Sequence, residues 1–151
     1  LNLMADIYGV SPALRAERIK EMADTFEISD VLKSSIQSYS HGMRQKVILI
    51  GALLHDPKVW ILDEPMTGLD PKSSFTLKER MRSHADKGNT VLFSTHVLEV
   101  AEKLCDRLGI ISHGRLMFCG TMQELRETAQ SDGSLESIFL ELTENKLTKE
   151  G

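Results

Sequence analysis

The spacing of apolar residues along the chain changes near residue 57. Before that point they recur at helical spacing, as Ile19, Met22 and Phe26 do, and Ser11-Pro12 supplies a cap and a proline for a helix start. After it, short apolar runs alternate with helical stripes. We therefore expect a helical segment over residues 1–56, followed by strands and helices in alternation.

Three short apolar runs, at residues 59–62, 90–94 and 108–111, predict buried strands. A helix that begins after Asp70 lies between the first two and carries Leu77 and Met81 on one face, and another helix precedes the third strand. Strands that are continuous in apolar residues and joined through helices favour a parallel sheet covered on both faces. The predicted fold class is α/β.

The last part of the chain follows a different pattern. His113-Gly114 is typical of a hairpin turn and leads to a fourth strand at residues 116–119. Thr121 is placed to cap a polar helix, and apolar residues from Leu135 onward indicate a final amphipathic helix. We expect three parts: a helical subdomain over 1–56, a β/α core over 57–120 and a helical extension over 121–151.

Two stretches carry candidate chemistry. The first is "YSHGMRQK" at residues 39–46, a polar turn at the start of a helix. The helix is apolar on almost every side over residues 47–54, which predicts that it is buried. A helix start offers unpaired backbone amides and a partial positive charge to an anion. In the second, "VWILDEP" at residues 59–65, a buried strand ends in two adjacent carboxylates.

The carboxylates Asp63 and Glu64 follow an apolar strand, and open α/β sheets bind their ligands at the carboxyl ends of their strands. Asp63 is placed to hold a hydrated Mg²⁺, which lets Glu64 orient and deprotonate water. A solvated acidic pair at the start of a loop is the simpler alternative. The four apolar residues before the pair favour the site.

Composition narrows the possible classes of protein. The 151 residues suffice for one domain with a core, and the net charge of -4 argues against broad electrostatic binding of nucleic acid. Cys105 and Cys119 lie far apart, so neither a disulfide framework nor a zinc cluster is indicated. The longest apolar run is far too short to cross a bilayer.

Four motifs occur along the chain in a fixed order: "YSHGMRQKV", "VWILDEP", "TGLD" and "FSTH". Their order and approximate spacing are those of an ATP-binding-cassette (ABC) nucleotide-binding domain, and the chain resembles the second half of one. The resemblance implies a P-loop NTPase-like parallel sheet with flanking helices and an ATPase that uses ATP and Mg²⁺. "YSHGM" and "SLESIFLELT" resemble the bacterial exporter-type branch of that family.

The resemblance also implies roles for single residues. Those at the start of the helix would bind the γ-phosphate of an ATP held mainly by the opposite subunit, Asp63 would bind the metal through water, and Glu64 and His96 would be catalytic. The loop that follows would cross a dimer interface. The implied nucleotide-binding residues are Ser40, His41, Gly42 and Met43, and the implied interface residues are Gly68, Leu69 and Asp70. Ser40 and Asp70 as helix caps, and His96 as a polar loop residue, are the simpler alternatives.

Tyr39, His41 and Met43 stand where the family usually has leucine, glycine and glutamine. No glycine is followed by lysine, so the phosphate loop GxxxxGK[ST] is missing. We therefore expect a fragment of a longer domain that by itself binds ATP weakly and hydrolyses it negligibly.

The resemblance implies a second nucleotide-binding subunit, identical or different, and an integral membrane permease as partners. It also implies a place in the cytoplasm on the inner face of the membrane. Two alternatives stay open: a non-catalytic truncated or regulatory module, and a soluble ABC ATPase not coupled to transport. Nucleic acid is not an expected partner.

Overall fold

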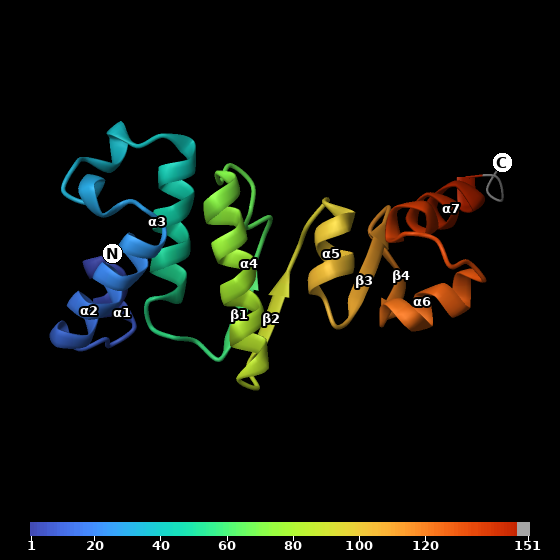
Figure 1. Cartoon of the computed structure of the whole chain (residues 1–151), viewed down its shortest axis with the longest axis horizontal. Coiled ribbons are helices and arrows are strands. Elements are labelled where there is room, and N and C mark those ends of the chain that lie inside the picture. Colours follow the sequence, from blue (N-terminus) through green and yellow to red (C-terminus); the bar gives the residue numbers. More distant parts are fainter. Residues whose placement is uncertain (148–151) are drawn as a thin grey trace. The chain divides into compact units, whose positions relative to one another are not determined.

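The computed structural model describes residues 1–147, which divide into two compact units, the first ending at Ser94 and the second beginning at Thr95 (Figure 1). The first unit contains α1 (Asn2–Ile7), α2 (Pro12–Thr25), the short 3₁₀ turns η1 (Ser29–Val31) and η2 (Ile36–Ser38), α3 (His41–Leu53), β1 (Val59–Leu62), α4 (Pro71–Asp86) and β2 (Thr90–Phe93). The second unit contains α5 (Leu98–Leu104), β3 (Leu108–Ser112), β4 (Arg115–Gly120), α6 (Met122–Ala129) and α7 (Leu135–Leu147).

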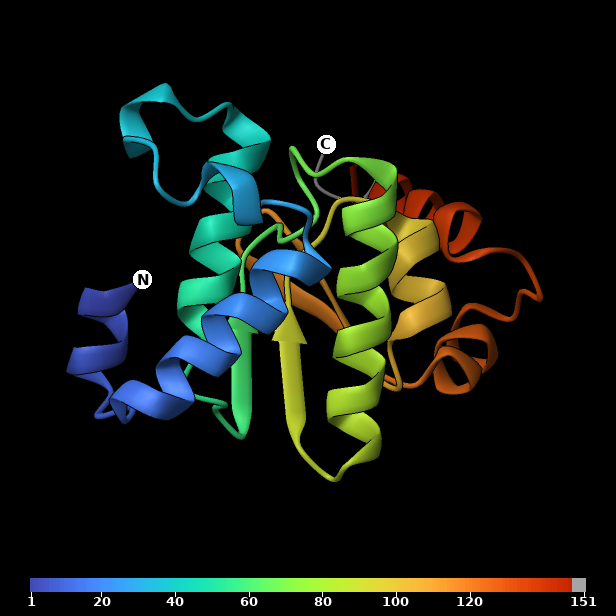
Figure 2. The ribbon, with the colours of Figure 1, turned by 60° about the vertical axis from the view of Figure 1, so that its left-hand side comes forward.

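Strands β1 and β2 pair in parallel, with Trp60 opposite Val91 and Leu62 opposite Phe93. Helix α4 connects them and runs alongside the pair (Figure 2). Trp60 is buried, and its ring stacks on that of His84 on α4 with 4.1 Å between the ring centroids. The predicted β–α–β unit is therefore confirmed for these two strands.

The face of the β1–β2 pair opposite α4 is exposed to solvent. Val59, Ile61 and Leu92 are 54%, 76% and 61% exposed, because side chains alternate between the two faces of a strand and only one face meets α4. The prediction of a parallel sheet covered on both faces is wrong for this part of the chain.

The helices before β1 pack around buried apolar residues that include Phe26, Ile50 and Leu54. Arg18 ties α2 to the end of α3 by donating from Nη1 to the carbonyl of Leu54 at 2.9 Å. Helix α3 is not buried all round as predicted: Ile48 is 62% exposed, since the neighbouring helices cover only one side. Only part of the apolar surface of α3 therefore belongs to the core.

The second unit contains a separate antiparallel pair. Strand β3 pairs with β4, and His113 and Gly114 between them both have positive φ, as a type I′ hairpin turn requires. The predicted hairpin is confirmed, but the prediction that residues 108–111 continue the parallel sheet is wrong. Strand β4 follows after only two turn residues, so its backbone amides and carbonyls can pair with those of β3.

The core of the second unit forms where the helices cover this hairpin. Its buried residues are Leu108, Ile110, Leu125, Leu135 and Ile138. Glu102 on α5 links the helices, since it accepts hydrogen bonds from Arg126 at 3.0 Å and from the backbone amide of Leu135 at 3.2 Å.

Several predicted helix starts are confirmed. Asp70 caps α4 by accepting from the amide of Ser73, and Thr121 forms a reciprocal capping box with Glu124. The three-part division at residues 56 and 120 stays a prediction. Across residues 1–147, none of the helices combines the length and the apolar character that crossing a membrane requires.

Candidate functional site

The predicted carboxylates lie at the carboxyl end of the parallel pair. Because Leu62 is opposite Phe93, the residues that follow, Asp63 and Ser94, leave the two strands at the same edge. The Ser94 hydroxyl donates a hydrogen bond to the Asp63 carboxylate and accepts one from the backbone amide of Glu64 at 2.9 Å. Ser94 therefore holds both acidic residues at the sheet edge.

Glu64 has an unusual backbone conformation. Its φ is +43°, in the left-handed region that residues with a Cβ seldom adopt. A residue held in such a conformation costs about 1–3 kcal/mol and persists where surrounding contacts fix it. The bond from its amide to Ser94 and the bond from the Thr67 amide to its carbonyl, at 3.0 Å, are two such contacts.

The surroundings of Asp63 fit a hydrated Mg²⁺. The residue is exposed, and Ser94 occupies one of its two carboxylate oxygens. Within the described part of the chain, no three His, Cys, Asp or Glu side chains gather where they could hold a metal ion among them. Mg²⁺ commonly keeps several waters and takes only one or two carboxylates together with substrate phosphates, so a single exposed aspartate suits it.

The polar turn before α3 forms a capped helix start. The side-chain oxygen of Ser40 accepts from the amide of Met43 at 3.2 Å, which confirms the simpler alternative that Ser40 is an N-cap. His41 and Gly42 begin the helix, and His41 is exposed. The cap satisfies one amide of the first turn, and the other free amides of that turn remain available to an anion.

Tyr39 is one of the three residues that differ from the family pattern, and its buried side chain anchors this turn. It is only 6% exposed, and its hydroxyl donates to the carbonyl of Val31 at 2.6 Å. Arg44 in turn donates from Nε to the carbonyl of Tyr39 at 3.1 Å. An aromatic residue with a polar tip is therefore well accommodated at this position.

The start of α3 touches the loop that precedes α4. A Cβ added to Gly42 would lie 2.6 Å from the carbonyl oxygen of Gly68, and one added to Gly68 would lie 2.4 Å from a ring carbon of His41. Gly68 also has a φ of +80°. The predicted nucleotide-binding and interface residues are thus in direct contact within one chain, because glycine at both positions lets the backbones approach.

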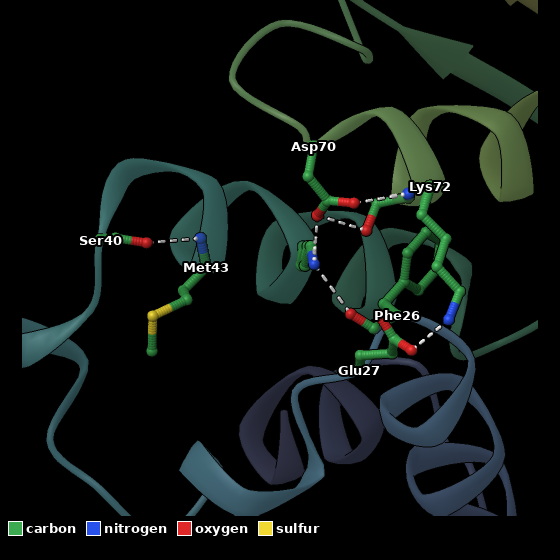
Figure 3. A network of polar contacts seen from close by, with 8 residues as sticks. Phe26, Glu27, Ser40, Met43, Asp70 and Lys72 are labelled. Carbon is green, nitrogen blue, oxygen red and sulfur yellow. Dashed lines mark hydrogen bonds and ion pairs between the residues drawn. The ribbon is translucent and has the colours of Figure 1, made fainter.

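Asp70 ends this loop and lies at the centre of a polar network (Figure 3). One carboxylate oxygen accepts from the Ser73 amide at 2.9 Å, and the other accepts from the Ser73 hydroxyl at 2.7 Å and from Lys46 Nζ at 2.7 Å. These contacts hold the pKa of Asp70 well below its usual range, and the hydrogen bond from Lys46 has the largest effect. Nearby, Lys72 pairs with Glu27.

The first unit therefore contains most of the predicted site residues, in two groups. Asp63 and Glu64 share Ser94, while the start of α3 contacts Gly68; Leu69 is partly buried in the loop between Gly68 and Asp70. His96 belongs to the second unit and is exposed, and its joint action with Glu64 stays a prediction.

Reasoning from the sequence missed Ser94 and Lys46. The position of Ser94 directly after the second strand could have revealed it, because the carboxyl ends of parallel strands meet at one edge. Lys46 carried no such signal.

Comparison with known proteins identifies the family. The family model described as ABC transporter matches residues 5–67. The ABC-type transporter ATP-binding protein EcsA of Bacillus subtilis is 39% identical over 144 residues, which cover 95% of this chain and 58% of that protein. A solved structure named "Structure of ATP binding subunit of ABC transporter" superposes with a TM-score of 0.88 at 37% identity, over 94% of this chain and 60% of that one.

The chain belongs to the ABC transporter family. It spans a little over half the length of EcsA and of the solved ATP-binding subunit. The daunorubicin/doxorubicin resistance ATP-binding protein DrrA of Streptomyces peucetius is 36% identical over 132 residues, 87% of this chain and 40% of that protein. The match to the ABC family model includes Ser40, Asp63 and Glu64. The predicted family and fold class are confirmed.

Proposed function

We propose that this chain forms part of the ATP-binding and ATP-hydrolysing subunit of a bacterial ABC exporter. The observation that carries the proposal is the arrangement at the sheet edge, where Ser94 holds Asp63 and Glu64 at the ends of two parallel strands. It is supported by the capped start of α3, which contacts the loop before α4. The fold places these elements in one compact unit.

In this proposal Asp63 binds Mg²⁺ through water, and the bound ion neutralises charge on the phosphates of ATP. Glu64 orients the attacking water and takes its proton, and His96 contacts the γ-phosphate and keeps that water in place. The amides of His41 and Gly42, with the Ser40 hydroxyl and the exposed His41 side chain, bind the γ-phosphate of an ATP held mainly by a second subunit, while the Met43 amide keeps its bond to Ser40.

The proposed partners follow from this division of work. A second nucleotide-binding subunit, identical or different, meets this one along Gly68, Leu69 and Asp70, and ATP lies between the two. An integral membrane permease receives the movement at the cytoplasmic face of the membrane. The name of one relative supports export: the Nod factor export ATP-binding protein I of Cupriavidus metallidurans is 35% identical over 125 residues, 83% of this chain and 41% of that protein.

The test is Glu64→Gln in the gene product that contains this sequence. The substitution keeps the size of the side chain but removes the base, and we expect steady-state ATP turnover to fall by about 10²–10⁴-fold while MgATP still binds. Glu79→Gln, an exposed position on α4, is the control. Turnover at the wild-type rate would remove Glu64 from its role.

The same variant tests the dimer. Because Glu64→Gln traps the nucleotide, we expect ATP to convert it from monomer to dimer in analytical ultracentrifugation. A sample that binds ATP and stays monomeric would contradict the shared site.

The 151-residue chain lacks a GxxxxGK[ST] loop, which supports a second proposal. Without that cradle for the phosphates, we expect these residues alone to bind MgATP weakly and to hydrolyse it negligibly. ATP turnover by the purified 151-residue chain, measured with and without Glu64→Gln, tests this; turnover that depends on Glu64 would overturn it.

A further inference from the structure

Lys46 occupies a position where a lysine is seldom found. It lies on α3 and is only 9% exposed. Its ammonium group donates to the carbonyl of Phe26 at 2.9 Å and pairs with the Asp70 carboxylate at 2.7 Å. A buried ammonium is tolerated only where such partners replace the water that it loses. Lys46 therefore joins the end of α2, the middle of α3 and the loop before α4.

Both oxygens of the Asp70 carboxylate are bound to groups of this chain. Both of its oxygens accept hydrogen bonds from Ser73, and the one that the Ser73 hydroxyl uses is also bound to Lys46. The loop that ends at Asp70 is thus fastened on one side to α4 by the cap and on the other side to α3 by the ion pair.

A second contact lies one helical turn away. Residues 42 and 46 are on the same face of α3, because positions four apart are neighbours on a helix surface. Gly42 touches the carbonyl oxygen of Gly68 and Lys46 binds Asp70. One face of α3 therefore lies along the loop from Gly68 to Asp70 and holds it at both ends.

We propose that Lys46 is a positioning residue for ATP hydrolysis: by binding Asp70, it makes the start of α3 and the loop Gly68–Asp70 move as one piece. This inference rests on the proposed function, in which the start of α3 binds phosphate and the loop forms the interface. If the two parts moved separately, each would have to be ordered when the subunits close on ATP, and that ordering would slow turnover.

A purely stabilising role explains the pair less well. Asp70 is 46% exposed, and relative to two apolar residues at these positions such an ion pair adds little net stability, because the ammonium has lost its water. What the pair does fix is a single geometry, since a charge in the protein interior strongly disfavours arrangements that leave it unpaired. A fixed geometry matters where a helix start and a loop must meet one nucleotide together.

The experiment measures kcat, KM and the dissociation constant for MgATP in the gene product that contains this sequence. We compare Lys46→Met, Lys46→Arg and Asp70→Asn with the wild type. The last substitution keeps the oxygen that caps α4, because asparagine caps helices as well as aspartate does, and replaces the charged oxygen that binds Lys46 and the Ser73 hydroxyl by an amide group. Lys103→Met, which breaks the exposed pair of Lys103 with Glu99, is the matched control.

We expect Lys46→Met and Asp70→Asn each to lower kcat about tenfold while the dissociation constant for MgATP changes less than about threefold. The double variant should be no slower than either single one, because both remove the same contact. Lys46→Arg should recover most of the rate, and Lys103→Met should stay within about twofold of the wild type.

Wild-type kcat in both single variants would overturn the inference and leave the proposed function intact, and so would losses that multiply in the double variant. If Lys46→Met fails to fold, Asp70→Asn decides alone, because it keeps the cap. A wild-type protein without ATP turnover would overturn the proposed function and this inference with it.

Discussion

The Ser94 hydroxyl donates a hydrogen bond to the carboxylate of Asp63, 31 residues earlier in the chain, and so joins the ends of two parallel strands. The same hydroxyl accepts a hydrogen bond from the backbone amide of Glu64. One small side chain thereby orients a carboxylate proposed to hold a metal and fixes the backbone of the residue proposed as the base.

Replacing Ser94 by alanine should loosen this edge. The change removes the donor to Asp63 and the acceptor that the amide of Glu64 uses, which should lower the free energy of unfolding by about 1–2 kcal/mol. Urea unfolding of the chain, followed by circular dichroism, measures the loss. Ser83→Ala at an exposed position of α4 should change it by less than about 0.5 kcal/mol. Equal losses in the two variants would contradict the special position of Ser94.

Two glycines on α3 should respond to alanine in opposite ways. Alanine normally stabilises a helix interior by about 1 kcal/mol relative to glycine, and at Gly51 its Cβ would meet Met4 at an ordinary 3.5 Å. At Gly42 it would lie 2.6 Å from the backbone oxygen of Gly68, which cannot rotate away. We expect Gly42→Ala to lower stability by about 1–3 kcal/mol and Gly51→Ala to raise it. Thermal unfolding of both variants checks the signs, and a stabilising Gly42→Ala would contradict the close contact.

The depressed pKa of Asp70 predicts a loss of stability in acid. Its pKa in the folded chain is lower than the value of about 3.9 in an unfolded chain, so its contribution is present above that pH and is lost as the pH falls toward the folded value. The pKa of Glu124 is also lowered, mainly by the hydrogen bond from the backbone amide of Thr121. This shift should likewise make the chain less stable in acid.

Asp70→Asn should therefore be less stable than the wild type near pH 7, and the difference should shrink as the pH falls below about 4. Urea unfolding across this pH range measures the difference. Asp30→Asn, at an exposed carboxylate, is the control. A difference between Asp70→Asn and the wild type that does not change with pH would show that charge is not its origin.

Glu102 offers a test in the second unit. Glu102→Ala removes the partner of Arg126 and the acceptor for the first amide of α7, which should lower the free energy of unfolding by about 1–3 kcal/mol. Glu99→Ala breaks the exposed pair with Lys103, which solvent screens, and should lower the free energy of unfolding by less. Chemical unfolding compares the two, and a Glu102 variant as stable as the Glu99 variant would refute the link between α5, α6 and α7.

The sequence predicted those elements whose local pattern also decides their structure. The stripe of Leu77 and Met81 and the cap at Asp70 define α4 without reference to the rest of the chain, and His113-Gly114 defines the hairpin. Pairing between distant strands is a different matter. Nothing local to residues 108–111 shows that β3 pairs with β4 and not with the parallel strands.

The candidate site was predicted to a similar extent. Asp63 and Glu64 were found because a buried strand ends at them, but the bridging role of Ser94 depends on the register of two strands. The positive φ of Glu64 and the partners of Lys46 arise from tertiary contacts. No periodicity or residue type records such contacts in advance.

The stacking of Trp60 on His84 gives the chain an optical probe of its own. Trp60 is the one tryptophan in the sequence, so all indole emission comes from the place where α4 meets β1. Emission from a buried indole shifts in wavelength when water reaches it. Separation of α4 from the strands can therefore be followed by fluorescence without attaching a dye.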